Sequence, residues 1–208
     1  MTVLVQPVSK SVPPEALADL LWSTDPKLNG YIFGKMDVLL KIIGTEWPAQ
    51  LGLYSFKHAF TAMHRGKVAG LLIGHTEEEY AANFDFSVDH QANALGEDEA
   101  RHLKSALHWM DRLFPAPRQN SYYILEFAVN PDMQGTGIAS QLFAIATKRA
   151  LAGGCNQICL DVAANNEAVS FYEHIGFSVE IESRVPVLDD EHGIGMHLHM
   201  VLEIGQSD

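Results

Sequence analysis

One apolar segment, residues 122–129, constrains the fold more than any other feature of the sequence. It contains a single charged residue, Glu126, and reads Tyr-Tyr-Ile-Leu-Glu-Phe-Ala-Val. Short, nearly continuous runs of this kind are typical of strands buried on both faces of a sheet. A loop with two glycines follows, and then a helix predicted over 138–151. A buried strand that leads through glycines into a helix predicts a mixed α/β fold.

The remaining periodicities fit the same class. The spacing of apolar residues predicts helices beginning at Pro13-Pro14 and over 31–43, 97–114 and 167–175. It predicts strands over 3–8, 59–64, 68–75, 157–162, 178–187 and 196–204, with a hairpin turn at Arg65-Gly66-Lys67. Residues 76–120 form the most irregular stretch, and the run Glu77-Glu78-Glu79 is expected on a solvated face. No repeat or linker divides the chain, so we expect one domain over 1–208.

Composition excludes several classes of protein. Of 208 residues, 47% are hydrophobic, which argues against bulk disorder. Acidic residues outnumber basic ones by 26 to 14, and a chain so poor in cations is unsuited to coating nucleic acid or anionic lipid. No apolar stretch approaches the ~18 residues of a membrane span, and no leader pattern is visible. Cys155 and Cys159 fit reduced thiols, so we expect a cytoplasmic protein.

The loop after the apolar segment contains Gly135-Thr136-Gly137. Glycines let successive N–H groups converge on a phosphate, and a following helix N-terminus adds its dipole. A Walker loop is excluded because no Lys-Ser/Thr pair follows. A Rossmann fingerprint fits better, with Asp161 as a candidate ribose ligand, although Ser140 stands where a third glycine or alanine belongs. A plain tight turn is the third alternative, and the loop alone does not decide among them.

A second segment, residues 165–177, gives the loop its context. Together the two segments resemble the GNAT acyltransferase superfamily. The first signature of that family matches Val129, Pro131, Gln134, Gly135, Gly137, Ile138 and Ala139, and the second matches Asn165, Ala168, Phe171, Tyr172, Gly176 and Phe177. The resemblance covers 122–183 closely. It implies a central splayed sheet of about seven strands flanked by helices, with 76–120 as a helical insertion between the third and fourth strands.

The resemblance also implies a cofactor and its contacts. The acyl donor would be acetyl-CoA, with no metal. Its pyrophosphate would be held by the backbone N–H groups of Gln134, Gly135, Thr136, Gly137, Ile138 and Ala139. Pantetheine would pair with the strand edge at Phe127 and Val129, where the Val129 N–H would polarise the thioester. Asn165 would orient the cofactor region, with a simple helix cap as the alternative.

Three side chains are candidates for proton transfer. Glu126 is the first choice of base, because a carboxylate in a buried strand is costly unless it is paired or functional. Asp161 is its rival on the strand over 157–162, and a structural role is its alternative. Tyr172 stands where the family places a general acid, with an aromatic core role as the alternative. Among ten histidines, His197 and His199 are expected on a solvated strand face, whereas His64, His75 and His90 are expected near the acceptor.

The leading hypothesis is transfer of an acetyl group from acetyl-CoA to a primary amine of a small molecule, amino acid or protein by direct attack. A non-catalytic acyl-CoA-binding module is the first alternative, and a dinucleotide-binding oxidoreductase is the second. The predicted partner is a small-molecule or peptide amine, neither nucleic acid nor membrane, with a homodimer as an open option. The sequence does not specify the acceptor, because residues 76–120 would shape that side of the site.

Overall fold

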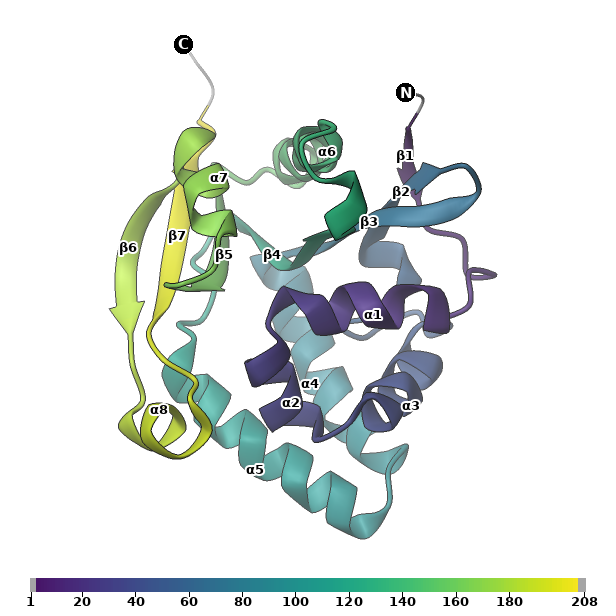
Figure 1. The fold of residues 1–208 in the computed structure, drawn as a ribbon, viewed down its shortest axis with the longest axis vertical. Helices are drawn as coiled ribbons and strands as arrows, with labels where there is room; N and C mark the ends of the chain where they lie inside the picture. Colours follow the sequence, from purple (N-terminus) through teal and green to yellow (C-terminus); the bar gives the residue numbers. More distant parts are fainter. Residues whose placement is uncertain (1–2, 206–208) are drawn as a thin grey trace.

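A computed structural model describes residues 3–205 and contains a seven-stranded sheet in the order β1-β2-β3-β4-β5-β7-β6 (Figure 1). Within these residues all neighbouring strands pair antiparallel except β4 and β5, which are parallel. The predicted mixed sheet is therefore confirmed. The strands are β1 (Leu4–Pro7), β2 (Ala59–His64), β3 (Lys67–Thr76), β4 (Ser121–Val129), β5 (Gln157–Ala163), β6 (Ser178–Ser183) and β7 (His197–Glu203).

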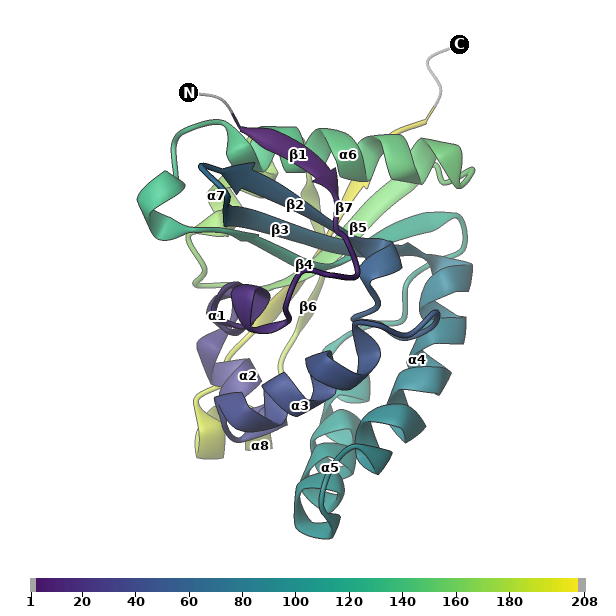
Figure 2. The same cartoon turned by 90° about the vertical axis from the view of Figure 1, so that its right-hand side faces the viewer.

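Helices cover both faces of the sheet. Figure 2 shows α6 on one side, with α1, α3, α4 and α5 on the other. The α6 side buries one large apolar cluster, and the α1 side buries a second that shares β3 and β4 with it. The helices are α1 (Glu15–Thr24), α2 (Pro26–Phe33), α3 (Met36–Glu46), α4 (Glu77–Asn93), α5 (Glu97–Leu113), α6 (Ile138–Ala152), α7 (Ala168–His174) and α8 (Pro186–His192). None of those in the described part of the chain is long and apolar enough to cross a bilayer.

The helix predicted over 31–43 is wrong in one respect, because the chain breaks it in two. Gly34 adopts φ 71°, a left-handed conformation that ends α2, and α3 starts two residues later. Asp25 begins α2 by accepting a hydrogen bond from the Leu28 N–H at 3.0 Å. The α1–α2 junction is thereby fixed beside β4.

The stretch expected to be irregular, 76–120, consists mainly of α4 and α5, and so confirms the helical insertion between β3 and β4. Thr76 and Glu79 form a capping box at the start of α4. The acidic run is thus the first turn of a helix, where negative charge is favourable.

The strand predicted over 178–187 is shorter than expected. β6 ends at Ser183, and Pro186 opens α8. Apolar residues of α8 pack with those of α2 and α5 in a third cluster. This cluster lies at the end of the molecule where the acceptor side of the site is found.

Candidate active site

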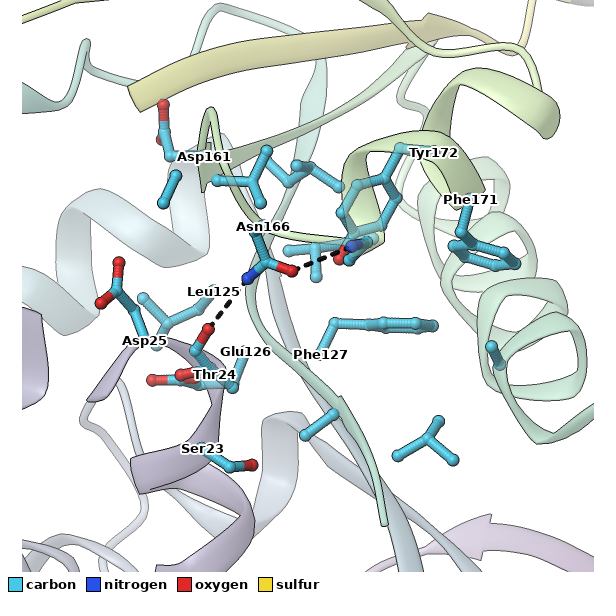
Figure 3. Close-up of a pocket in the computed structure, with 18 of the residues that line it drawn as sticks. Ser23, Thr24, Asp25, Leu125, Glu126, Phe127, Asp161, Asn166, Phe171 and Tyr172 are labelled. Atoms are coloured by element: carbon cyan, nitrogen blue, oxygen red, sulfur yellow. Dashed lines mark hydrogen bonds between the residues drawn. The ribbon is translucent and has the colours of Figure 1, made fainter. Parts of the chain in front are cut away.

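A cavity of about 1030 Å³ lies where β4 and β5 separate. The two strands pair from Ser121↔Gln157 to Ile124↔Leu160, and no pairing follows Ile124 although β4 runs on to Val129. The predicted splay is therefore confirmed. Figure 3 shows α1, β4, β5 and α7 each contributing side chains to the cavity.

A β-bulge in β4 determines which of its side chains face the α6 side of the sheet and which face the α1 side. Glu126 pairs with Ile73 and Ile124 with Gly74, so Leu125 is an extra residue. Without it Glu126 would share the α6 face with Tyr122 and Ile124. With it Glu126 points to the α1 side, beside Thr24 (Figure 3).

The glycine loop presents a row of free backbone donors. Gly135 and Gly137 adopt φ 70° and 81°, and a Cβ at either would meet no atom within 4 Å. Within residues 3–205 the N–H groups from Gly135 to Ser140 donate to no protein acceptor, whereas the next one, of Gln141, bonds to the Gly137 carbonyl. Three of these six free donors precede a 15-residue helix and three belong to its first turn, an arrangement that suits a pyrophosphate. The loop thus fits the phosphates of CoA.

The edge of β4 beyond the splay also has free donors. The Asn130 N–H bonds to the Ala69 carbonyl on the β3 side at 2.9 Å. Because successive N–H groups of a strand point to opposite neighbours, those of Phe127 and Val129 face the gap. Pantetheine can therefore add there as a strand. Phe127 lies nearer to Glu126 than Val129 does, which makes its N–H the better placed of the two for the thioester oxygen.

The cavity has one half lined by the glycine loop and another, called the acceptor half below, lined by residues of α1 and α2. Glu126 lies at the junction between these two halves. The residue is 8% exposed, and burial raises the pKa of its carboxyl to about 8. The Thr24 and Tyr54 hydroxyls oppose that rise, and the Tyr54 hydroxyl lies 3.5 Å from Oε1. No Lys or Arg side chain in residues 3–205 pairs with Glu126, so the carboxylate has no structural ion pair with either residue type. The carboxyl is thus poised to exchange a proton near neutral pH.

Tyr172 projects from α7 towards β4. Its ring packs 6.2 Å from that of Phe127 and 5.7 Å from that of Phe177, and the residue is 5% exposed. Burial, and secondarily the Glu126 charge, raise the pKa of the phenol, so it stays protonated at neutral pH. The ring packs in the core, as the alternative interpretation of Tyr172 predicts. The residue also lines the cavity.

Asp161 is held by two side chains. The Tyr123 hydroxyl donates to Oδ2 at 2.9 Å, and His199 Nδ1 lies 3.0 Å from Oδ1. The expectation that His197 and His199 lie on a solvated face is wrong, since they are 3% and 2% exposed. His197 Nε2 lies 3.2 Å from Oδ2 of Asp25. Two carboxylates from other elements satisfy these rings and so allow their burial.

The residue whose side chain bonds to the first N–H of α7 is Asn166, one position after the predicted Asn165. Asn166 Oδ1 accepts from the Ala168 N–H at 2.9 Å, and its Nδ2 donates to the Thr24 carbonyl at 3.3 Å (Figure 3). Asn165 is exposed and makes no side-chain hydrogen bond in the described chain. Its helix-cap alternative is therefore wrong, and its contact with the cofactor stays a prediction.

The other histidines do not reach this cavity. His64, His75 and His90 are absent from its lining within residues 3–205, contrary to expectation. His75 lies with His58 and Glu79 in a cluster of metal-ligating groups. The Asn83 amide lies 3.1 Å from His58 Nε2 and 3.3 Å from His75 Nδ1, while His58 Nδ1 has no hydrogen-bond partner in residues 3–205 and lies 3.9 Å from Oε2 of Glu79.

The acceptor side of the cavity has no signature in the sequence. Its contributors come from six separate segments, and no motif spacing connects them. They are Ser23, Thr24, Asp25, Leu28, Asn29, Ile32, Tyr54, Tyr80, Phe114, Tyr123 and His197.

Comparison with known proteins agrees with this geometry. A sequence model described as the acetyltransferase (GNAT) family matches residues 17–177, which is most of the chain. The chain belongs to the acetyltransferase (GNAT) family. The strand order and the family together exclude the doubly wound dinucleotide-binding alternative.

Solved structures share the fold at low sequence identity. An N-acetyltransferase from Staphylococcus aureus Mu50 superposes with a TM-score of 0.69 at 16% identity, covering 96% of this chain and 100% of that one. A Bacillus subtilis acetyltransferase in complex with CoA gives 0.56 at 15%, covering 97% and 99%. The ribosomal-protein-S18-alanine N-acetyltransferase from Escherichia coli gives 0.53 at 14%, covering 100% and 97%. No curated protein sequence matches the chain.

Proposed function

We propose that this GNAT-family protein transfers an acetyl group from acetyl-CoA to a primary amine by direct attack of the amine on the thioester. One observation carries the proposal. A row of unpaired backbone donors and a buried carboxyl with a raised pKa line the same cavity, on either side of the β4 edge.

The binding steps follow from the free backbone donors. The N–H groups of Gly135 to Ala139 would hold the pyrophosphate, and Gln134 would lie at its edge. Bound acetyl-CoA supplies an electrophilic thioester carbonyl. The N–H of Phe127 would polarise that carbonyl, while Val129 pairs with pantetheine nearer the loop. A relative whose structure contains CoA shares this fold, which supports the choice of donor.

The proton transfers involve two side chains. An ammonium acceptor must lose a proton before its nitrogen can attack, and Glu126 would accept it at the junction of the cavity. When the C–S bond breaks, the thiolate takes a proton, which the protonated hydroxyl of Tyr172 would donate. Asp161 would not serve as base, because Tyr123 and His199 already donate to its two oxygens. Two free, buried cysteines fit a cytoplasmic setting.

The test is a panel of amines with acetyl-CoA, followed by release of the CoA thiol and by mass spectrometry of the amine. The proposal expects one acetylated amine per thiol released, and no release without an amine. An acyl-CoA-binding module would instead bind acetyl-CoA and release no thiol with any amine. Thiol release at the same rate without amine would indicate hydrolysis and contradict the proposal.

A further inference from the structure

The acceptor half of the cavity contains a second carboxylate that the proposed mechanism does not use. Asp161 lines the cavity, and its side chain is only 4% exposed. A charged group this deeply buried costs free energy unless it has partners or a function. Asp25, the other spare carboxylate of this half, already has a structural role because it begins α2.

The partners of Asp161 leave part of its hydrogen-bonding capacity free. Each carboxylate oxygen has one partner: the Tyr123 hydroxyl lies 2.9 Å from Oδ2, and His199 Nδ1 lies 3.0 Å from Oδ1. An ionised carboxylate can accept about four hydrogen bonds. Both donors fix the direction of the carboxylate, and neither donor is a permanent cation that would neutralise it.

The walls around Asp161 suit a cation. The rings of Tyr80 and Tyr123 lie 5.1 Å apart at 75°, and both line the cavity. Aromatic faces attract ammonium groups, most strongly where water is excluded. No Lys or Arg lines the cavity within residues 3–205, so no permanent cation there would repel a positive ligand.

Elements that are distant in the sequence contact one another near the acceptor end of the cavity. α8 reaches α2, where the rings of Tyr31 and His192 lie 4.5 Å apart and Lys27 Nζ donates to the Gly193 carbonyl at 3.3 Å. Phe114, at the end of α5, packs 5.4 Å from the His197 ring. Figures 1 and 2 both show α8 beside α2 at this end. Phe114 and His197 also line the cavity, so their contact borders this end.

We propose that Asp161 binds a second positive group of the acceptor, which is a small diamine. This inference rests on the proposed acetyl transfer. Figure 3 shows the two carboxylates apart, with Glu126 beside α1 and Asp161 nearer β7. One nitrogen would lose its proton to Glu126 and attack, while the other would remain an ammonium paired with Asp161.

The test compares a homologous series of α,ω-diamines with n-alkylamines of the same length. The expected result is a kcat/KM that is ~10-fold or more higher for the best diamine, mainly through KM. Asp161→Asn should remove this preference by raising KM for the diamine, with little change for the alkylamine. Tyr123→Phe removes a hydrogen bond but not the charge, so the preference should persist. Asp98→Asn, on the exposed surface of α5, is the matched control and should behave as wild type.

Binding measurements separate this inference from the proposed function. Titration calorimetry of diamine and alkylamine into the protein saturated with CoA needs no turnover. Equal affinities for the two amines, or an unchanged preference in Asp161→Asn, would overturn the diamine assignment even if acetyl transfer occurs. Preferential diamine binding without any thiol release would support the Asp161 site and contradict the transferase proposal. If Asp161→Asn does not fold, the wild-type comparison of the two amine series still decides.

Discussion

At position 126 the chain places a carboxyl group where water does not solvate its charged form. Burial raises its pKa from 4.5 to about 8, so the folded state holds the proton more tightly than the unfolded chain does. The resulting stability is fully present below the unfolded value and is lost as the pH rises through the folded one. At alkaline pH the ionised carboxylate destabilises the fold.

Glu126→Gln tests that linkage. Between about pH 6 and about pH 9 the wild type should lose on the order of a few kcal/mol of unfolding free energy that the variant retains. Urea unfolding of both proteins at the two pH values measures the difference. An equal loss in wild type and variant would show that Glu126 does not titrate in this range.

Tyr172→Phe keeps the ring and removes the hydroxyl. Because the ring packs against Phe127 and Phe177, the fold and CoA binding should persist. The loss of the proton donor should lower kcat by roughly 10- to 100-fold with little change in KM. Steady-state thiol release measures both constants. An unchanged kcat would assign Tyr172 to the core alone.

The sequence predicts Glu126 and Tyr172 as site residues, because one is a lone charge in an apolar strand and the other lies in a family signature, and both line the cavity. It misplaces His197 and His199. Their alternation with apolar residues is typical of a half-exposed strand. Both rings are nevertheless buried, because Asp25 and Asp161 pair with them. Partners that come from distant segments leave no local pattern.

At the scale of elements, the glycine loop makes a prediction of its own. Gly137→Ala forces a side chain into φ 81° and places a Cβ in the space expected to hold phosphate. Affinity for acetyl-CoA should fall ~10-fold or more, as measured by calorimetry. Gly66→Ala, at φ 78° in the β2–β3 turn with equally open surroundings, is the matched control for backbone strain. Equal loss of affinity in both variants would contradict phosphate binding by the glycine loop.

Helix α4 shows why one element escaped prediction. Its buried face is polar, with Asn83, Ser87 and Gln91 at four-residue spacing, so it has no apolar periodicity. Asn83 accepts from the Gly52 N–H at 2.9 Å, and the Ser87 hydroxyl accepts from the Leu53 N–H at 2.8 Å. These bonds attach α4 to the loop that leads to β2. By contrast, α6 and the strands other than β6 follow their apolar patterns, which predict them within a few residues.

Asn83→Ala should therefore destabilise the protein. The change removes the hydrogen-bond partner of the buried Gly52 N–H, of His58 Nε2 and of His75 Nδ1. We expect this to cost about 1–3 kcal/mol of unfolding free energy. Thermal unfolding measures the effect. The control is Asn93→Ala on the exposed end of α4, which should change stability little. Similar effects of the two changes would contradict a structural role for the polar face.

At the scale of the whole molecule, the net charge of −12 has a physical consequence for the anionic cosubstrate. Because no Lys or Arg lines the cavity within residues 3–205, backbone N–H groups and a helix N-terminus must supply the attraction for phosphate. The acidic groups instead gather in the acceptor half. The half of the cavity with free N–H groups and the half with acidic groups meet at Glu126, where β4 and β5 separate.

The most direct test of this account is the pH dependence of kcat/KM for the amine at saturating acetyl-CoA, measured for wild type and Glu126→Gln. The wild-type rate should rise with pH through an inflection near 8, as the carboxyl becomes a base. The variant should be slower by ~100-fold or more and should lack that inflection. Titration of the amine itself is common to both proteins and cancels in the comparison. A variant with the same profile and nearly the same rate as wild type would contradict the account.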